Sequence, residues 1–149
     1  MNTAVRNCIA LALFTFTMAC KAQVLHHDED VAAAKATAFV TAAVVKQDWD
    51  AAYMMMREED RRTVALARFT EVMKTAHPSG FPTEVHATEF EPVPGQPAIQ
   101  IFLEGRNGKE RFYYRVPLVG TSSRGYFPQG LFRGNMPYPK SGLRRPLKL

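Results

Sequence analysis

The sequence predicts an α+β domain in which N-terminal helices pack on a curved, cone-like antiparallel sheet, after a cleaved signal peptide. Three observations support this prediction: an uncharged apolar stretch near the N-terminus, helical spacing of apolar residues up to about residue 76, and short alternating segments between prolines and glycines from residue 81 onward. The chain has 149 residues, of which 46% are hydrophobic and 22% are charged, which suits one packed domain. This composition excludes a disordered acidic chain, collagen and a disulfide-rich miniprotein.

The N-terminal stretch has the pattern of a secretory signal. A short start with one basic side chain, Arg6, is followed by an uncharged run from Cys8 to Cys20. A membrane-spanning helix needs about 20 apolar residues, so this run is too short to be a permanent anchor. Both cysteines lie in this segment, so the chain that follows it has no disulfide.

Residues 17–20, Thr-Met-Ala-Cys, resemble the lipobox of bacterial lipoprotein signal peptides, with threonine in place of the usual leucine. The resemblance implies that residues 1–19 are removed and that Cys20 carries lipid. It also implies that Lys21, which is not an aspartate, directs the protein to the periplasmic side of the outer membrane. Ordinary cleavage after Ala19 or Ala22, which would give a soluble periplasmic or secreted form, remains open.

We expect four regions: a signal peptide (1–19), a tether (20–29), an α+β domain (30–134) and a basic tail with prolines (135–149). The tether contains His26 and His27 beside carboxylates. Adjacent ligands on a flexible segment do not make a metal site, so we expect no metal and no cofactor. Asp28 or Asp30 is expected to cap the first helix.

Apolar spacing predicts three helices. The first runs from about residue 30 to 46, and its expected packing stripe is Val31, Ala34, Ala38, Ala42 and Val45. Asp48 is expected to cap a short second helix through residues 49–56, followed by a charged run at 57–62 that forms a solvated turn or helix start. The third helix is expected over about 59–76, with Val64, Ala67 or Arg68, Val72 and Ala76 on one face, and residues 77–80 end it.

Short strands are expected after residue 81. They cover 85–92, 99–103 and a return strand after the Asn107-Gly108 hairpin signal. On the return strand Phe112, Tyr114, Val116 and Leu118 face one way, and Arg111, Tyr113 and Arg115 face the other. A last strand over 125–133 is interrupted at 128–130, and the tail is expected to be extended and only partly packed.

The element order resembles the nuclear-transport-factor-2-like superfamily of cone-shaped domains over about residues 30–120. So does the pattern Ala38-Phe39-Val40-x-x-Ala43, followed by Gln47-Asp48-Trp49-Asp50-Ala51-Ala52-Tyr53. Gln47 stands where many members carry glycine. The superfamily hosts isomerases, dehydratases and non-catalytic ligand-binding domains, so the resemblance does not select a function. A cystatin-like sheet on one helix is the alternative fold.

Charge is divided unevenly along the chain. Residues 20–91 carry a net charge of −4, whereas residues 92–149 carry +8. The candidate ligand- or partner-binding residues are therefore basic or hydrogen-bonding side chains of the second half: Arg111, Tyr113, Arg115, Arg124 and Arg133. If the face of Arg111, Tyr113 and Arg115 is concave it forms a basic floor for an anionic ligand, and if it is solvated these residues are ordinary surface. Nucleic acid is not an expected partner, because an exported protein seldom meets it.

Catalytic motifs are missing. The sequence has no G-x-S-x-G, H-E-x-x-H, phosphate-binding loop or dinucleotide fingerprint. The favoured hypothesis is a small non-enzymatic envelope lipoprotein that is anchored through Cys20 and binds an anionic ligand or an acidic protein partner. One alternative is a periplasmic immunity protein that inhibits a toxic enzyme. The other is an isomerase-like enzyme, with Asp48, Asp50, His77 or His86 as its base.

Overall fold

The computed structural model describes residues 25–148. The expected signal peptide, Cys20 and the first half of the expected tether lie outside the described residues. In the described part no helix is both long and apolar enough to cross a membrane.

Helices fill the first half of the described chain and strands the second. The helical elements are α1 (Glu29–Val40), the π-helical turn η1 (Thr41–Val45), α2 (Trp49–Met54), α3 (Glu58–Thr63) and α4 (Leu66–Thr75). The strands are β1 (Glu84–Pro92), β2 (Ala98–Asn107), β3 (Glu110–Thr121), β4 (Gly125–Pro128), β5 (Phe132–Gly134) and β6 (Arg145–Pro146). The predicted α+β class is confirmed.

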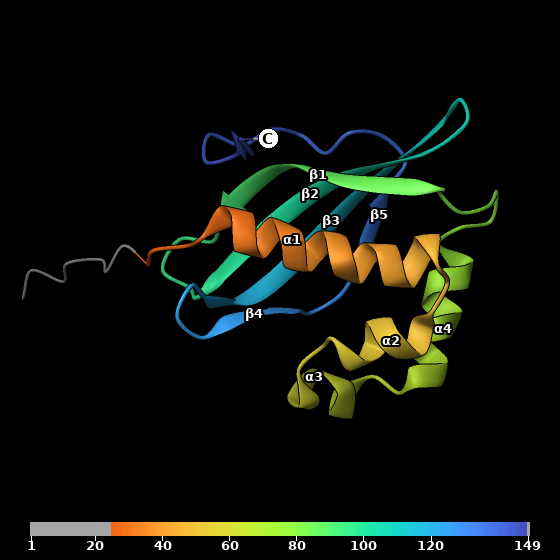
Figure 1. Ribbon diagram of the computed structural model, residues 1–149, viewed down its shortest axis with the longest axis horizontal. Helices are drawn as coiled ribbons and strands as arrows, with labels where there is room; N and C mark the ends of the chain where they lie inside the picture. Colours follow the sequence, from red (N-terminus) through yellow and green to blue (C-terminus); the bar gives the residue numbers. More distant parts are fainter. Residues whose placement is uncertain (1–24, 149) are drawn as a thin grey trace, which may run out of the picture.

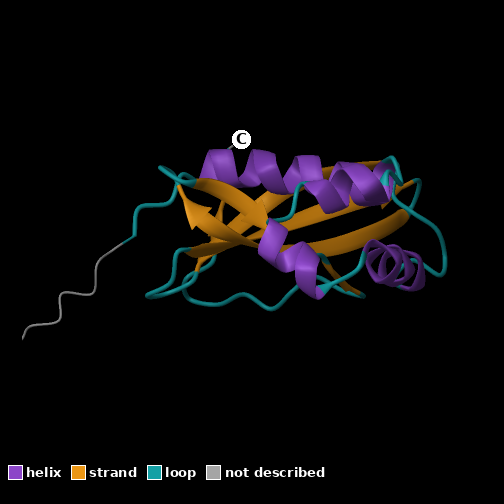
Figure 2. Ribbon diagram, turned by 90° about the horizontal axis from the view of Figure 1, so that it is seen from below, coloured by secondary structure: helices purple, strands orange, loops and turns teal. Residues whose placement is uncertain are grey.

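The strands form one antiparallel sheet that is curled but not closed. Its order is β4-β3-β2-β1-β6, and β5 pairs with β3 beyond the end of β4. Helix α1 lies along one face of the sheet, and α2, α3 and α4 gather near one end (Figures 1 and 2). The sheet therefore has an inner face covered by α1 and an outer face turned away from it.

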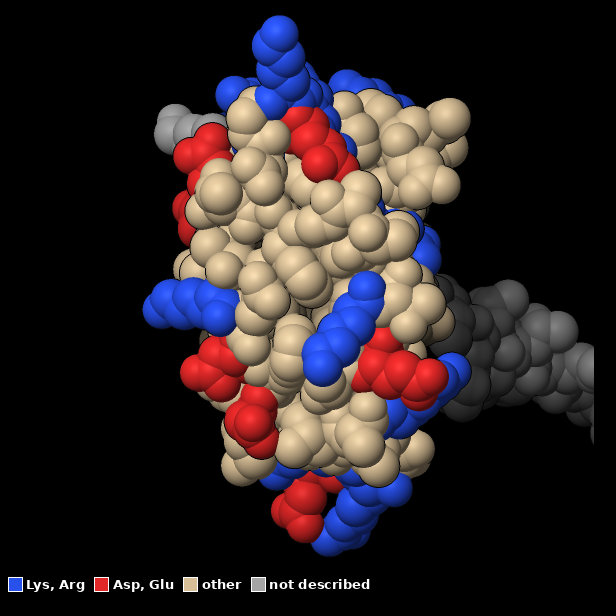
Figure 3. Space-filling view, turned by 90° about the vertical axis from the view of Figure 1, so that its right-hand side faces the viewer, with Lys and Arg blue, Asp and Glu red and all other residues tan. Residues whose placement is uncertain are grey.

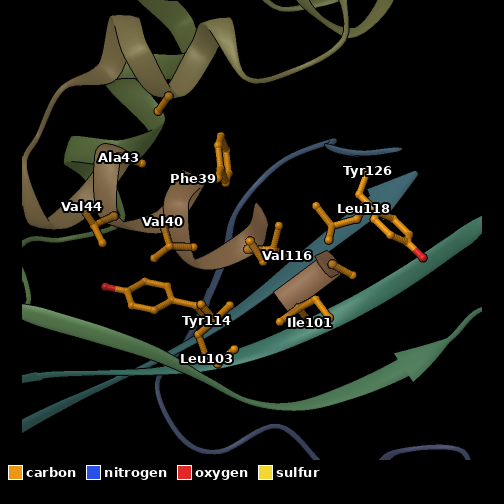
Figure 4. Close-up of a cluster of buried hydrophobic side chains, with 14 of the residues drawn as sticks. Phe39, Val40, Ala43, Val44, Ile101, Leu103, Tyr114, Val116, Leu118 and Tyr126 are labelled. Carbon is orange, nitrogen blue, oxygen red and sulfur yellow. The ribbon is translucent and has the colours of Figure 1, made fainter. Parts of the chain in front are cut away.

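The core lies between α1 and the inner face of the sheet. Phe39 and Val40 of α1 meet Ile101, Tyr114 and Val116 of the sheet, and all five side chains are fully buried (Figure 4). Burial of this apolar area is the main source of the fold's stability.

Helix α1 begins as expected but packs with a different face. The Asp28 carboxylate accepts a hydrogen bond from the Val31 amide at 3.0 Å and caps the helix. The expected stripe is wrong, because Val31 is 51% exposed and Ala34 and Ala38 are exposed too. The buried face is instead Ala32, Ala36, Phe39, Val40, Ala43 and Val44. Alanine and valine occur all round this helix, so their spacing does not define a face, and Phe39 determines which side packs.

The expected third helix is two helices. Val64 has extended backbone angles (φ −128°, ψ 110°) and separates α3 from α4. Val72, expected inside, is 39% exposed, whereas Phe69 and Met73 are buried. As in α1, the large apolar side chains lie on the buried face of the helix, and the spacing of the smaller ones predicts the wrong face.

The strand predictions are confirmed. Phe112, Tyr114, Val116 and Leu118 are all fully buried on the inner face. The β2–β3 hairpin has a two-residue loop, in which Gly108 takes the first position with φ 56°. The tail contributes β6, which pairs with β1 at Glu89 and Phe90.

Candidate binding site on the outer face of the sheet

The outer face carries the side chains that alternate with the core residues. Residues directly opposite each other in antiparallel strands share a face. Phe102 is paired with Arg115, Glu104 with Tyr113, and Glu89 with Phe102. These five side chains of β1, β2 and β3 therefore lie on the outer face. Arg111, Tyr113 and Arg115 share this face as expected, and it is the face turned away from α1.

A segment of the tail crosses this face. We call residues 135–144, which join β5 to β6, the strap. In Figure 1 the chain after β5 runs along the β1 side of the sheet to the C-terminus. The Tyr138 ring packs on the Phe102 ring with centroids 5.7 Å apart, so the strap contacts the sheet through an aromatic pair.

Arg115 is enclosed by aromatic rings. Its guanidinium carbon lies 4.8 Å from the Phe132 ring centroid and 5.6 Å from that of Tyr138. Contact with two aromatic faces favours the cation and restricts the rotation of its guanidinium. Among the described residues Arg115 forms no ion pair, and its Nε has no hydrogen-bond partner. Arg115 is therefore a positioned cation without an anion.

Glu89 holds the other end of the strap. Its carboxylate forms ion pairs with Arg144 (Nη2–Oε2, 2.8 Å) and Lys140 (Nζ–Oε1, 3.2 Å). The Arg144 side chain is only 5% exposed, and its guanidinium carbon lies 3.5 Å from the Phe102 ring centroid. Arg144 also donates to the carbonyls of Tyr138 and Pro139. Two tail cations are thus bound within the chain itself.

A cavity of about 340 Å³ lies between the strap and the sheet. The sheet contributes Thr88, Glu89, Phe102, Glu104 and Tyr113, and the strap contributes Pro137, Tyr138, Lys140 and Arg144. Burial raises the pKa of Tyr138, and the positive charge of Arg115 opposes this rise. The volume is within the range of small-molecule sites.

The other candidate arginines lie at different distances from the strap and on different faces of the sheet. Arg111 is exposed on the outer face and lies 3.7 Å from Glu104. Arg124 is exposed in the β3–β4 turn, at the opposite end of β3. Arg133 is paired with Tyr114 and so faces inward, where its guanidinium carbon lies 4.8 Å from the Phe112 ring centroid. Only Tyr113 and Arg115 lie beside the strap.

Arg133 belongs to a buried polar cluster behind α4. His77, which is 4% exposed, has Nδ1 2.7 Å from the Met73 carbonyl and Nε2 2.9 Å from the Tyr114 hydroxyl. A carbonyl only accepts, so Nδ1 donates to it, and the neutral ring accepts from Tyr114 at Nε2. Burial lowers the pKa of His77. The Met73 bond opposes this shift, and the nearby Arg133 charge adds to it.

The remaining isomerase candidates occupy separate places. Asp48 accepts from the Ala51 amide at 3.0 Å and caps α2, as expected. Asp50 lies in the first turn of that helix. His86 lines a groove of about 290 Å³ between α1 and β1. Within residues 25–148 no three metal-ligating side chains lie together.

Charges of both signs are mixed at the α4 end of the molecule. Figure 3 shows a broad uncharged area there, with Lys, Arg, Asp and Glu side chains above and below it. The net charge of +8 in residues 92–149 already includes Glu104 and Glu110, and Glu89 of the first half also pairs with Lys140 and Arg144. Among the described residues the outer face has two arginines without an ion pair, the exposed Arg106 opposite Arg111 and the half-buried Arg115, and of these only Arg115 is packed against aromatic rings.

Sequence reasoning missed the strap. In the sequence, Tyr138 and Arg144 fall in the basic tail over 135–149, and Glu89 falls in the strand expected over 85–92. Their contacts join positions far apart in the chain, which local spacing does not report. Comparison of the chain with family models, with curated proteins and with solved structures gave no match.

Proposed function

We propose that this protein is a non-enzymatic lipoprotein of the cell envelope that binds an acidic protein partner through its outer sheet face. The lipobox resemblance at residues 17–20 supports the anchor at Cys20. The single observation that supports the binding role is Arg115, which is held between the Phe132 and Tyr138 rings and has no anionic partner among the described residues.

The surroundings of Arg115 are those of a protein interface. Phe132 is 49% exposed beside it, and Met136 and Leu143 of the strap are 71% and 43% exposed. Arginine and aromatic residues are the side chains most enriched at the centres of protein interfaces, and methionine is enriched there as well. An acidic side chain approaching in the plane of the guanidinium gains two parallel hydrogen bonds.

A protein partner is favoured over a lipid surface. Binding to anionic lipid gains about 1 kcal/mol for each nearby Lys or Arg and depends on several of them together. Arg144 and Lys140 are bound to Glu89, and Arg111 lies beside Glu104. Among the described residues the outer face then offers only Arg106, opposite Arg111, as a further unpaired arginine beside Arg115. One positioned arginine among apolar groups suits a specific carboxylate better than a charged sheet of headgroups.

Affinity capture from envelope extract tests the proposal. The purified protein is immobilised as wild type, as Arg115→Gln and as Arg124→Gln, the last being a matched control at an exposed arginine away from the strap. We expect the wild type and Arg124→Gln to retain an acidic protein that salt elutes, and Arg115→Gln to lose it. Equal capture by all three proteins, or binding only to anionic vesicles, contradicts the proposal.

A further inference from the structure

We infer that the cavity between the strap and the sheet is a second site, separate from Arg115, which binds a neutral saccharide. Arg115 does not line this cavity, although it packs on Tyr138, which does. The inference concerns a different ligand from the proposed protein partner. It follows from the charge balance of the lining, from its aromatic rings and from its hydrogen-bonding groups.

The ionic lining is balanced. Two carboxylates, Glu89 and Glu104, face two cations, Lys140 and Arg144. Glu89 is bound to both cations, at 3.2 and 2.8 Å, and Glu104 lies 3.7 Å from Arg111. An ionic ligand gains nothing from a cavity without net charge and still loses its hydration. The lining therefore suits a ligand that is polar but uncharged.

The rings provide apolar walls. Tyr113 on the sheet and Tyr138 on the strap are both half-buried and line the cavity from two sides. The Tyr138 hydroxyl donates to the Phe132 carbonyl at 3.0 Å, which fixes its ring. The C–H face of a sugar ring packs on such aromatic surfaces, because the ring face is electron-rich.

Donors and acceptors alternate around these rings. Within residues 25–148 the Tyr113 hydroxyl has no hydrogen-bond partner, and the Glu104 carboxylate is only loosely engaged by Arg111. Lys140, with a side chain 79% exposed, offers further donors at the opening. A hydroxyl both donates and accepts, so a ligand with several hydroxyls satisfies this mixed set, whereas a pure anion or cation does not. Aromatic walls together with donors and acceptors suit a saccharide, which has both C–H faces and several hydroxyls.

Titration followed by ¹⁵N–¹H NMR tests the inference on the purified protein. The probes are N-acetylglucosamine and its β-1,4-linked trimer as neutral sugars, and glucuronic acid as the anionic one. We expect saturable shifts for the amides of residues 104, 113, 138 and 140–144 with the neutral sugars only. Tighter binding of the trimer than of the monomer would identify a glycan chain as the source, and equal binding a free sugar.

Single-atom variants separate binding from folding. Tyr113→Phe keeps the ring and removes the hydroxyl, and Glu104→Gln keeps the shape and removes the charge. Each is expected to raise the dissociation constant for the neutral sugar about tenfold, because one hydrogen bond to the ligand is lost. Glu84→Gln, on the same sheet but outside the cavity, is expected to leave neutral-sugar binding unchanged.

Two outcomes overturn the inference. One is the absence of saturable shifts with either neutral sugar in a protein that gives a well-dispersed spectrum. The other is preferential binding of glucuronic acid, since it would show that the cavity selects charge. Neither outcome affects the capture experiment on Arg115, so the two sites fail or succeed separately.

Discussion

Arg144 of the strap and Glu89 of β1 form an ion pair of 2.8 Å, and their side chains are only 5% and 19% exposed. The two residues are far apart in the sequence, and their contact ties the tail to the sheet. Removal of one partner from a shielded pair leaves the other charge uncompensated, which costs more than the pair itself contributes.

Glu89→Gln is therefore expected to destabilise the protein by about 2–3 kcal/mol, because Arg144 remains buried without its anion. Urea unfolding measures the loss, and hydrogen exchange of residues 137–146 is expected to rise with it. Glu71→Gln is the matched control, since it breaks the Arg68–Glu71 pair, in which both side chains are about two-thirds exposed. The control is expected to cost less than about 0.5 kcal/mol. Equal losses in the two variants contradict a structural role for the strap pair.

The His77–Tyr114 contact predicts a pH dependence of stability. Burial lowers the pKa of His77 below the value of about 6.5 expected in the unfolded chain. The unfolded state then binds a proton more readily than the folded state. The stabilising contribution is complete above pH 6.5 and is lost as the pH falls through 6.5 toward the lower folded pKa. Urea unfolding between pH 7.5 and 5 checks this, and His77→Gln is expected to show a smaller decline. A wild-type free energy of unfolding that rises on acidification through this window contradicts it.

Gln47 ends the first helical segment in a strained backbone conformation. Its φ of 55° is the one positive value among the described non-glycine residues. Gln47→Gly is expected to stabilise the protein by about 1 kcal/mol, because glycine adopts this conformation without steric cost. Thermal unfolding measures the change. Gln129→Gly, at a loop position with negative φ, is expected to give no gain in stability. A similar gain in this variant would contradict relief of backbone strain at residue 47 as the cause.

The predicted anchor is tested by metabolic labelling. Incorporation of radioactive palmitate is expected for the wild type and not for Cys20→Ser, because the thiol of Cys20 is the attachment point that the lipobox resemblance implies. Mass spectrometry of the mature N-terminus gives the cleavage site. A protein that starts after Ala19 or Ala22 with no lipid would establish ordinary signal peptidase cleavage instead.

Part of the fold was predictable from local patterns. The alternation of Phe112, Tyr114 and Val116 identifies β3 and its two faces, because a half-buried strand has a strict period of two. The packing face of α1 was not predictable from the spacing of Ala and Val, since these small apolar residues occur on all sides of the helix. Only the large side chain of Phe39 indicates which side is buried. Helix boundaries such as the one at Val64 depend on tertiary packing in the same way.

The candidate site was predictable only in part. Tyr113 and Arg115 share a face through the same alternation, and that prediction is confirmed. Arg133 was grouped with them, but the pairing of Arg133 with Tyr114 turns it to the inner face. The Phe132–Arg115–Tyr138 stack needs both the register of β5 and the path of the strap. Neither is encoded in a local spacing.

Photo-crosslinking in cells tests the binding role of the outer face most directly. A photoreactive phenylalanine replaces Phe132 beside Arg115 or, as a control, Val72, an exposed apolar residue of α4. The account predicts that the probe at position 132 crosslinks to an acidic envelope protein, that Arg115→Gln abolishes the product, and that the probe at position 72 gives none. A product only at position 72, or one at position 132 that persists with Arg115→Gln, would contradict the account.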